Sequence, residues 1–143
     1  MERGEHIHVI SAGEGIHTAY SASFRELPGI TRTIVFADST NYESSPDTVK
    51  EKSRLAVRNA VSAVQQISAS LSIPFTRENV FPPVYPSVIA ILAKVRRDHP
   101  GARFTFDLSG GSKDLCMALQ ATAPWVGAEV WCSFDGKRPS PVP

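Results

Sequence analysis

The sequence lacks the features that would place it in a membrane, in an oxidising compartment or on a polyanion. No apolar run approaches the roughly 20 residues that a transmembrane helix requires, and the first residues lack the apolar segment of a signal peptide. The 15 lysines and arginines nearly balance the 14 aspartates and glutamates. A net charge of +1 predicts no overall attraction to nucleic acid. We therefore expect a cytoplasmic protein with no membrane partner.

Cysteine is scarce as well. Cys116 and Cys132 fall in a predicted helix and a predicted strand, and without a secretion signal they are predicted to be buried thiols rather than a disulfide. His6 and His8 share one face of a predicted strand, but nothing nearby completes a set of zinc ligands. We interpret them as a structural pair at a strand edge, and we expect neither a metal nor another cofactor.

The residues that are present suit one globular domain. A chain of 143 residues that is 42% hydrophobic and 20% charged can build a single hydrophobic core. We assign residues 1–137 to this domain. Residues 138–143 contain three prolines, which cannot occupy the interior of a helix or a sheet. This segment is predicted to be a tail or the beginning of a linker.

Strand and helix patterns alternate along the chain. Runs of β-branched and aromatic residues predict strands, and apolar residues at helical spacing predict the helices between them. Strands are expected at residues 6–12, 32–37, 73–80, 103–108 and 129–134, and helices at residues 15–27, 45–71, 86–98 and 112–126. The alternation predicts an α/β fold, a Rossmann-like three-layer sandwich with a mostly parallel central sheet.

The longest predicted helix has a clear start signal. Ser45 followed by Pro46 predicts an N-cap and a first helical residue. Its apolar stripe is expected to extend from Val49 to Leu71. The segment before it, residues 38–45, is predicted to be a polar loop.

Ligands of parallel sheets bind beyond the carboxyl ends of the strands, where the strand order changes direction. The strand-to-helix loops are therefore the candidate sites. They lie at residues 11–15, 38–45, 81–85 and 109–113. The loop at 81–85, with two prolines, is expected either to line the same pocket or to cap the following helix.

The segment from Ser109 to Lys113 has the chemistry of a phosphate site. Adjacent glycines let the backbone turn sharply and approach a ligand without a Cβ in the way. The first N–H groups of the following helix attract anions, and two hydroxyls and one ammonium group add donors. The segment is neither a P-loop nor GxGxxG. The alternative is that Ser109 or Ser112 caps the helix and the glycines only make the turn.

A second loop of small residues follows the first predicted strand, in the sequence ISAGEGIHTAY (residues 10–20). It is expected to bring further donors to the same edge, although Glu14 has the wrong sign for phosphate. The loop after the second strand is expected to contribute adenine contacts, from Asn41 and Tyr42. The predicted ligand-binding residues are Ser11, Ala12, Gly13, Thr18, Asn41, Ser109, Gly110, Gly111, Ser112 and Lys113.

The segment FDLSGGSKDLCMAL, residues 106–119, resembles the signature of CARF (CRISPR-associated Rossmann fold) domains. In that signature a strand ends in Asn or Asp, and an apolar residue, Ser/Thr-Gly-Gly-Ser/Thr and Lys or Arg lead into a helix rich in Ala, Met and Leu. Residues 107–113 match it position by position. The order of elements and the small-residue loop after the first strand extend the resemblance over most of the chain.

The resemblance implies a homodimer that binds a cyclic oligoadenylate, the second messenger of type III CRISPR antiviral signalling. A two-fold dimer would present each loop twice to one symmetric ring. In many members of the family the domain regulates an attached effector, such as a ribonuclease or a winged-helix DNA-binding domain. An effector or DNA-binding domain beyond residue 143 is therefore a partner that the resemblance allows.

The resemblance leaves ring cleavage open. Some members, called ring nucleases, cut the ligand without metal, because a ribose 2′-OH attacks its own phosphate and the protein stabilises the developing charge. The residues that match such catalytic groups are Lys113 and Ser11. The alternatives are a purely ligand-sensing domain and a generic Rossmann-like module that binds a mononucleotide. In that last case Asp38 would contact the ribose.

Overall fold

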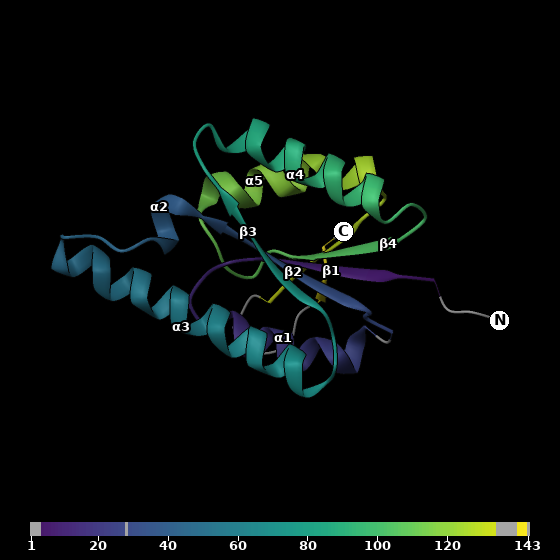
Figure 1. Cartoon of the computed structure of the whole chain (residues 1–143), viewed down its shortest axis with the longest axis horizontal. Coiled ribbons are helices and arrows are strands. Elements are labelled where there is room, and N and C mark those ends of the chain that lie inside the picture. The colour runs from purple at the N-terminus through teal and green to yellow at the C-terminus, as the bar shows by residue number, and fades with distance from the viewer. Residues whose placement is uncertain (1–3, 28, 134–139, 143) are drawn as a thin grey trace.

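The computed structural model describes residues 4–27, 29–133 and 140–142 of the chain. The chain forms an α/β sandwich (Figure 1). Its strands are β1 (His6–Ser11), β2 (Arg32–Asp38), β3 (Phe75–Val80), β4 (Arg103–Asp107), β5 (Glu129–Cys132) and β6 (Ser140–Pro141). Its helices are α1 (Ile16–Glu26), α2 (Ser39–Tyr42), α3 (Thr48–Ser70), α4 (Val84–Asp98) and α5 (Lys113–Val126).

The strands form one sheet in the order β3-β2-β1-β4-β5-β6. All neighbouring pairs are parallel except the last, because β6 pairs antiparallel with β5. The chain builds the sheet outwards from β1 to β3 and then returns to place β4 on the other side of β1. The change of direction therefore lies between β1 and β4, and the predicted fold class is confirmed.

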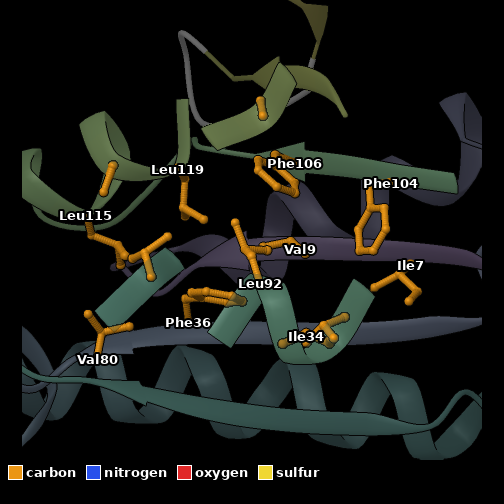
Figure 2. Packing of buried hydrophobic residues seen from close by; sticks show 14 residues of the cluster. Ile7, Val9, Ile34, Phe36, Val80, Leu92, Phe104, Phe106, Leu115 and Leu119 are labelled. Carbon is orange, nitrogen blue, oxygen red and sulfur yellow. The ribbon is translucent and has the colours of Figure 1, made fainter. Parts of the chain in front are cut away.

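Helices cover both faces of the sheet. Figure 1 shows α1 and α3 on one face and α4 and α5 on the other. Each face has its own core, and Figure 2 shows the one under α4 and α5, where Val9, Phe36 and Phe106 of three adjacent strands meet Leu92 and Leu119. Because both faces are covered, the central strands are apolar on both sides. The strand ends at the carboxyl edge are therefore positioned by packing on both faces of the sheet.

Two details around α3 differ from the sequence-based expectation. The segment expected to be loop contains the short helix α2, which Asp38 caps by accepting a hydrogen bond from Thr40 N. The N-cap of α3 is Asp47, not Ser45, and its carboxylate accepts from two backbone N–H groups. In each case an aspartate side chain accepts from the first backbone N–H groups of the helix, and Ser45 Oγ instead accepts from Asp47 N at 3.2 Å.

The buried face of α3 is also displaced from the expected stripe. Val57, Val61 and Val64 are buried, whereas Val49 is 81% exposed and Leu71 is 50% exposed. The N-terminal end of α3 extends beyond the sheet that the helix covers, so it has no sheet beneath it (Figure 1). Helical spacing identified the correct helix but not the part of it that is covered.

The interpretation of His6 and His8 as a strand-edge pair is wrong. They lie on β1, in the middle of the sheet, and both are buried. Thr105 Oγ1 on β4 lies 2.9 Å from His6 Nε2 and 2.7 Å from His8 Nδ1. Burial, with a smaller contribution from the charge of His6, lowers the pKa of His8 to about 3. The pair is a polar cluster inside the core.

The C-terminal segment contributes to the sheet edge. Ser140 and Pro141 form β6, and Pro141 pairs with Trp131 of β5. Proline is tolerated there because an edge strand leaves N–H positions without a ladder partner. Residues 134–139 of the last predicted strand and of the tail lie outside the described residues. Among the described helices none is both long and apolar enough to cross a bilayer.

Candidate functional site

The two glycine loops interlock at the carboxyl edge, between β1 and β4. A Cβ on Gly13 would stand 2.3 Å from Gly111 N and 2.8 Å from Gly110 Cα. Gly111 adopts a φ of +101°, and a Cβ there would stand 2.9 Å from Ser11 Cβ. These positions require glycine because the two backbones touch. The loops that the sequence predicted separately therefore form one structure at the switch point of the sheet.

Ser11 stabilises the contact between the two loops from inside the protein. Its side chain is fully buried, and its hydroxyl donates to the carbonyl of Gly110. The thiol of Cys116 donates to the same carbonyl at 3.0 Å. The Ser11 hydroxyl is thus turned into the protein, so the structure favours a positioning role for Ser11 over direct contact with a ligand or catalysis.

Ser109 is also engaged within the protein. Its hydroxyl donates to Asp107 Oδ1 and accepts from Ser133 N at 2.7 Å. Its backbone N–H donates to the same carboxylate oxygen at 2.9 Å. Burial raises the pKa of Asp107, and the hydrogen bonds from Ser109 oppose that shift. Ser109 therefore closes the turn and ties β4 to the end of β5, instead of presenting a free donor.

Ser112 caps α5 and connects two loops. Its Oγ accepts from Leu115 N at 3.2 Å and donates to Asp38 Oδ2 at 2.6 Å. The other oxygen of Asp38 accepts from Thr40 N and from Thr40 Oγ1. Asp38 thus fixes the start of α5 against the end of β2. Both of its oxygens are engaged, which argues against a ribose contact of a mononucleotide module.

Lys113 is a cation at this edge that forms no ion pair with a described residue. It is the first residue of α5, its side chain is exposed, and it makes no hydrogen bond or ion pair with the residues that the structure describes. The N–H groups of the first turn of α5 face the same edge. A free ammonium beside a helix N-terminus is suited to binding an anion.

The remaining predicted residues differ in their positions. Asn41 Nδ2 donates to Ala12 O at 3.3 Å, so Asn41 and Ala12 belong to the interlocked loops. Thr18 is exposed on α1. Tyr42 is stacked under the guanidinium of Arg77, 4.8 Å from the ring centroid, so one face of its ring is already covered. An adenine could stack only on the other face.

A hollow of about 560 Å³ lies between α5 and the loop before α4, and Asp114, the residue after Lys113, is part of its wall. Apolar side chains dominate its wall, including Tyr85 and Met117, which are 48% and 62% exposed. The lining residues are Asp38, Thr40, Pro82, Pro83, Val84, Tyr85, Pro86, Asp114, Met117, Ala118 and Ala121. Part of the predicted loop at 81–85 does line a pocket at this edge.

Sequence reasoning missed the contribution of α5 to the hollow. Asp114, Met117 and Ala121 recur at helical spacing, one step away from the stripe that packs on the sheet. A large apolar residue off the main stripe, such as Met117, is the signal that could have indicated a second face. The hollow offers apolar contact for a flat ring and the exposed carboxylate of Asp114 as an acceptor. Among the described residues no group of three potential metal ligands lies together.

Replacing Ser112 by alanine should lower the free energy of unfolding by about 1–2 kcal/mol, because the cap of α5 and the hydrogen bond to Asp38 are lost together. Urea unfolding measures the change. Ser70→Ala is the matched control, since that exposed hydroxyl only donates to Ile67 O within its own helix. An equal effect of the two substitutions would contradict the role of Ser112.

Comparisons with known proteins agree with the fold. No protein-family model matches the chain, and no curated protein matches it significantly. Csm6 from Enterococcus italicus, bound to cyclic hexa-2′-fluoro-hexa-dAMP, is similar over 91% of this chain with a TM-score of 0.68 and 11% identity. Can2 from Sulfobacillus thermosulfidooxidans, in complex with cyclic tetra-adenylate, is similar over 89% with a TM-score of 0.57 and 15% identity.

The matched regions make up 34% and 32% of those two chains, so this chain spans about a third of their length. At these identities the likeness establishes a shared fold. The resemblance to CARF domains that residues 106–119 indicated is therefore confirmed at the level of the fold.

Proposed function

We propose that this protein is a CARF-type domain that binds a cyclic oligoadenylate at the carboxyl edge of its sheet, between β1 and β4. The observation that carries the proposal is the unneutralised Lys113 at the start of α5, on loops interlocked at the switch point. Two proteins with this fold were solved with cyclic oligonucleotides bound. The free thiols of Cys116 and Cys132 suit a reducing compartment, and we place the protein in the cytoplasm.

The ligand would contact fewer of the predicted residues than expected. Phosphate would bind to Lys113 and to the N–H groups at the start of α5. An adenine would enter the adjoining hollow, against Tyr85 and Met117. The serines would act indirectly, because Ser11, Ser109 and Ser112 already donate to protein acceptors and hold the loops in place.

Two copies of the chain would share one ring. A cyclic oligoadenylate has rotational symmetry, and a two-fold dimer would present Lys113 from both sides. The exposed apolar side chains near the site, Phe81, Tyr85 and Met117, provide surface that a second copy would cover. An effector or DNA-binding domain is the partner through which such binding would act.

Ring cleavage is a separate step of the proposal. If it occurs, a ribose 2′-OH attacks the adjacent phosphorus, the bond to the 5′ oxygen breaks, and a cyclic phosphate end and a 5′-OH remain. Lys113 would stabilise the charge that develops on the phosphate oxygens. Ser11 would keep the loop in register without touching the reacting atoms.

Calorimetry with cyclic tetra- and hexa-adenylate in EDTA, followed by chromatography of the nucleotides, tests binding and cleavage together. We expect Lys113→Ala to weaken binding at least about tenfold, because the variant loses one charge-assisted hydrogen bond to the ligand. Lys50→Ala, an exposed lysine on α3, is the control and should bind normally. No heat with either ring at about 50 μM protein would exclude the proposed ligand. If the ligand binds and stays intact, the protein is a ligand sensor. If linear products form and Lys113→Ala abolishes them, the protein is a ring nuclease.

A further inference from the structure

A second hollow lies at the opposite end of the molecule from the proposed ligand site. It has a volume of about 370 Å³ and lies between the C-terminal ends of α4 and α5. Both helices begin at the carboxyl edge and run away from it, left to right in Figure 1. The lining residues are Leu92, Ala93, Arg96, Arg97, Trp125 and Val126. We call this surface the α4–α5 groove.

The groove has an apolar floor and an exposed indole. Leu92 is fully buried and Val126 partly so, and both belong to the core under these helices. Trp125 is 53% exposed, although it is the largest kind of apolar side chain. Leaving that apolar area in water is unfavourable. An exposed tryptophan beside a hollow is typical of the central contact of a protein interface.

Two arginines border the indole. Arg96 and Arg97 are exposed, and Arg96 donates to Trp125 O at 3.0 Å. Within the described residues the ion pairs are Arg58–Glu51 and His99–Glu5, so neither groove arginine has an acidic partner there. The C-terminal end of α4 attracts cations through its dipole. Both arginines also line the same hollow as Trp125, so their charges lie at its rim.

We propose that the α4–α5 groove is a docking surface for an acidic protein segment that inserts one apolar side chain between Leu92 and Trp125 and places carboxylates on Arg96 and Arg97. Guanidinium groups match carboxylates in a bidentate manner, and tryptophan and arginine are the residues that most often dominate binding at interfaces. The inference goes beyond the proposed nucleotide binding and does not depend on it.

The lining favours a protein segment over a nucleic acid. A nucleobase edge presents donors as well as acceptors, but the polar side chains that line this hollow are Arg96 and Arg97, which can only donate. An aliphatic or aromatic side chain needs no polar partner. Because the groove lies at the far end of α4 and α5 from Lys113, the partner and an anionic ligand at the carboxyl edge could bind at the same time.

Fluorescence polarisation with two labelled helical peptides tests the proposal. Each peptide, about 15 residues long, carries a central leucine, which is flanked by glutamates in one peptide and by lysines at the same positions in the other. We expect the glutamate peptide to bind at least about tenfold more tightly than the lysine peptide. The double variant Arg96→Glu, Arg97→Glu should reverse this preference. The double variant Lys50→Glu, Lys52→Glu makes the same charge change on α3 and should leave the preference intact.

Trp125→Ala tests the apolar contact separately and should weaken binding of the glutamate peptide about tenfold. Circular dichroism verifies that each variant is folded. Equal binding of the two peptides, or no binding, overturns the proposal. A dimer that Trp125→Ala dissociates would show that a second copy of the chain covers the groove. Binding of a short single-stranded RNA that is lost on Arg96→Glu, Arg97→Glu would show a nucleic-acid surface. Either result overturns the assignment to an acidic protein segment, and neither bears on cyclic oligoadenylate binding.

Discussion

Gly13→Ala is expected to remove much of the stability of the protein, by about 3 kcal/mol or more. The added methyl group would lie 2.3 Å from Gly111 N and 2.8 Å from Gly110 Cα. Both are backbone atoms, so no side chain can rotate away to make room. Relief would require the β1–α1 and β4–α5 loops to separate, which would also disrupt the Ser11 hydrogen bond to the Gly110 carbonyl.

Urea unfolding of three alanine variants tests this expectation. Gly110→Ala should be less damaging, because the nearest atom that its Cβ would meet is the side-chain Cγ2 of Ile16, at 2.7 Å, although Gly13 Cα also lies 3.1 Å away. Gly4→Ala is the control, since no heavy atom lies within 4 Å of the new Cβ. If Gly13→Ala unfolded at the same urea concentration as Gly4→Ala, the loops would not be interlocked in solution.

Acid is expected to destabilise the protein through His8. Burial lowers the pKa of His8 to about 3 in the folded protein, against 6.5 in an exposed histidine. Below pH 6.5 the unfolded chain therefore binds a proton that the folded protein excludes. The stability contributed by the neutral, buried form is complete above that pH and is lost progressively as the pH falls towards 3. The whole effect amounts to about 5 kcal/mol.

The pH dependence of urea unfolding between about pH 7 and pH 4 measures this loss. His8→Gln should be less stable at neutral pH, because its contact with Thr105 changes, but it should lose less stability on acidification. Burial raises the pKa of Asp107, which gives the opposite slope, so the difference between variant and wild type isolates His8. The wild-type slope in His8→Gln would show that His8 is not the group that titrates.

Local patterns were enough to predict the architecture. Each central strand is an apolar run and each helix carries an apolar stripe, because every element buries its own surface against the sheet. The errors lie where a local signal competes with a neighbour, as at Asp47, which replaces Ser45 as the N-cap of α3. The exposure of Val49 depends on where the sheet ends beneath α3, which periodicity does not encode.

By itself the sequence determined the alternation of strands and helices, the glycine-rich loops at strand ends and the placement of Lys113 at the start of a helix. Only the tertiary structure decided what Ser11 and Ser112 do, because the groups to which they donate are distant in the chain. Ser11 donates to Gly110, and Ser112 to Asp38, each across more than seventy residues. A hydroxyl can serve a ligand or a protein carbonyl equally well, and only the packing of the loops decides which it meets. For that reason Lys113, which has no such partner among the described residues, is the predicted site residue most available to a ligand.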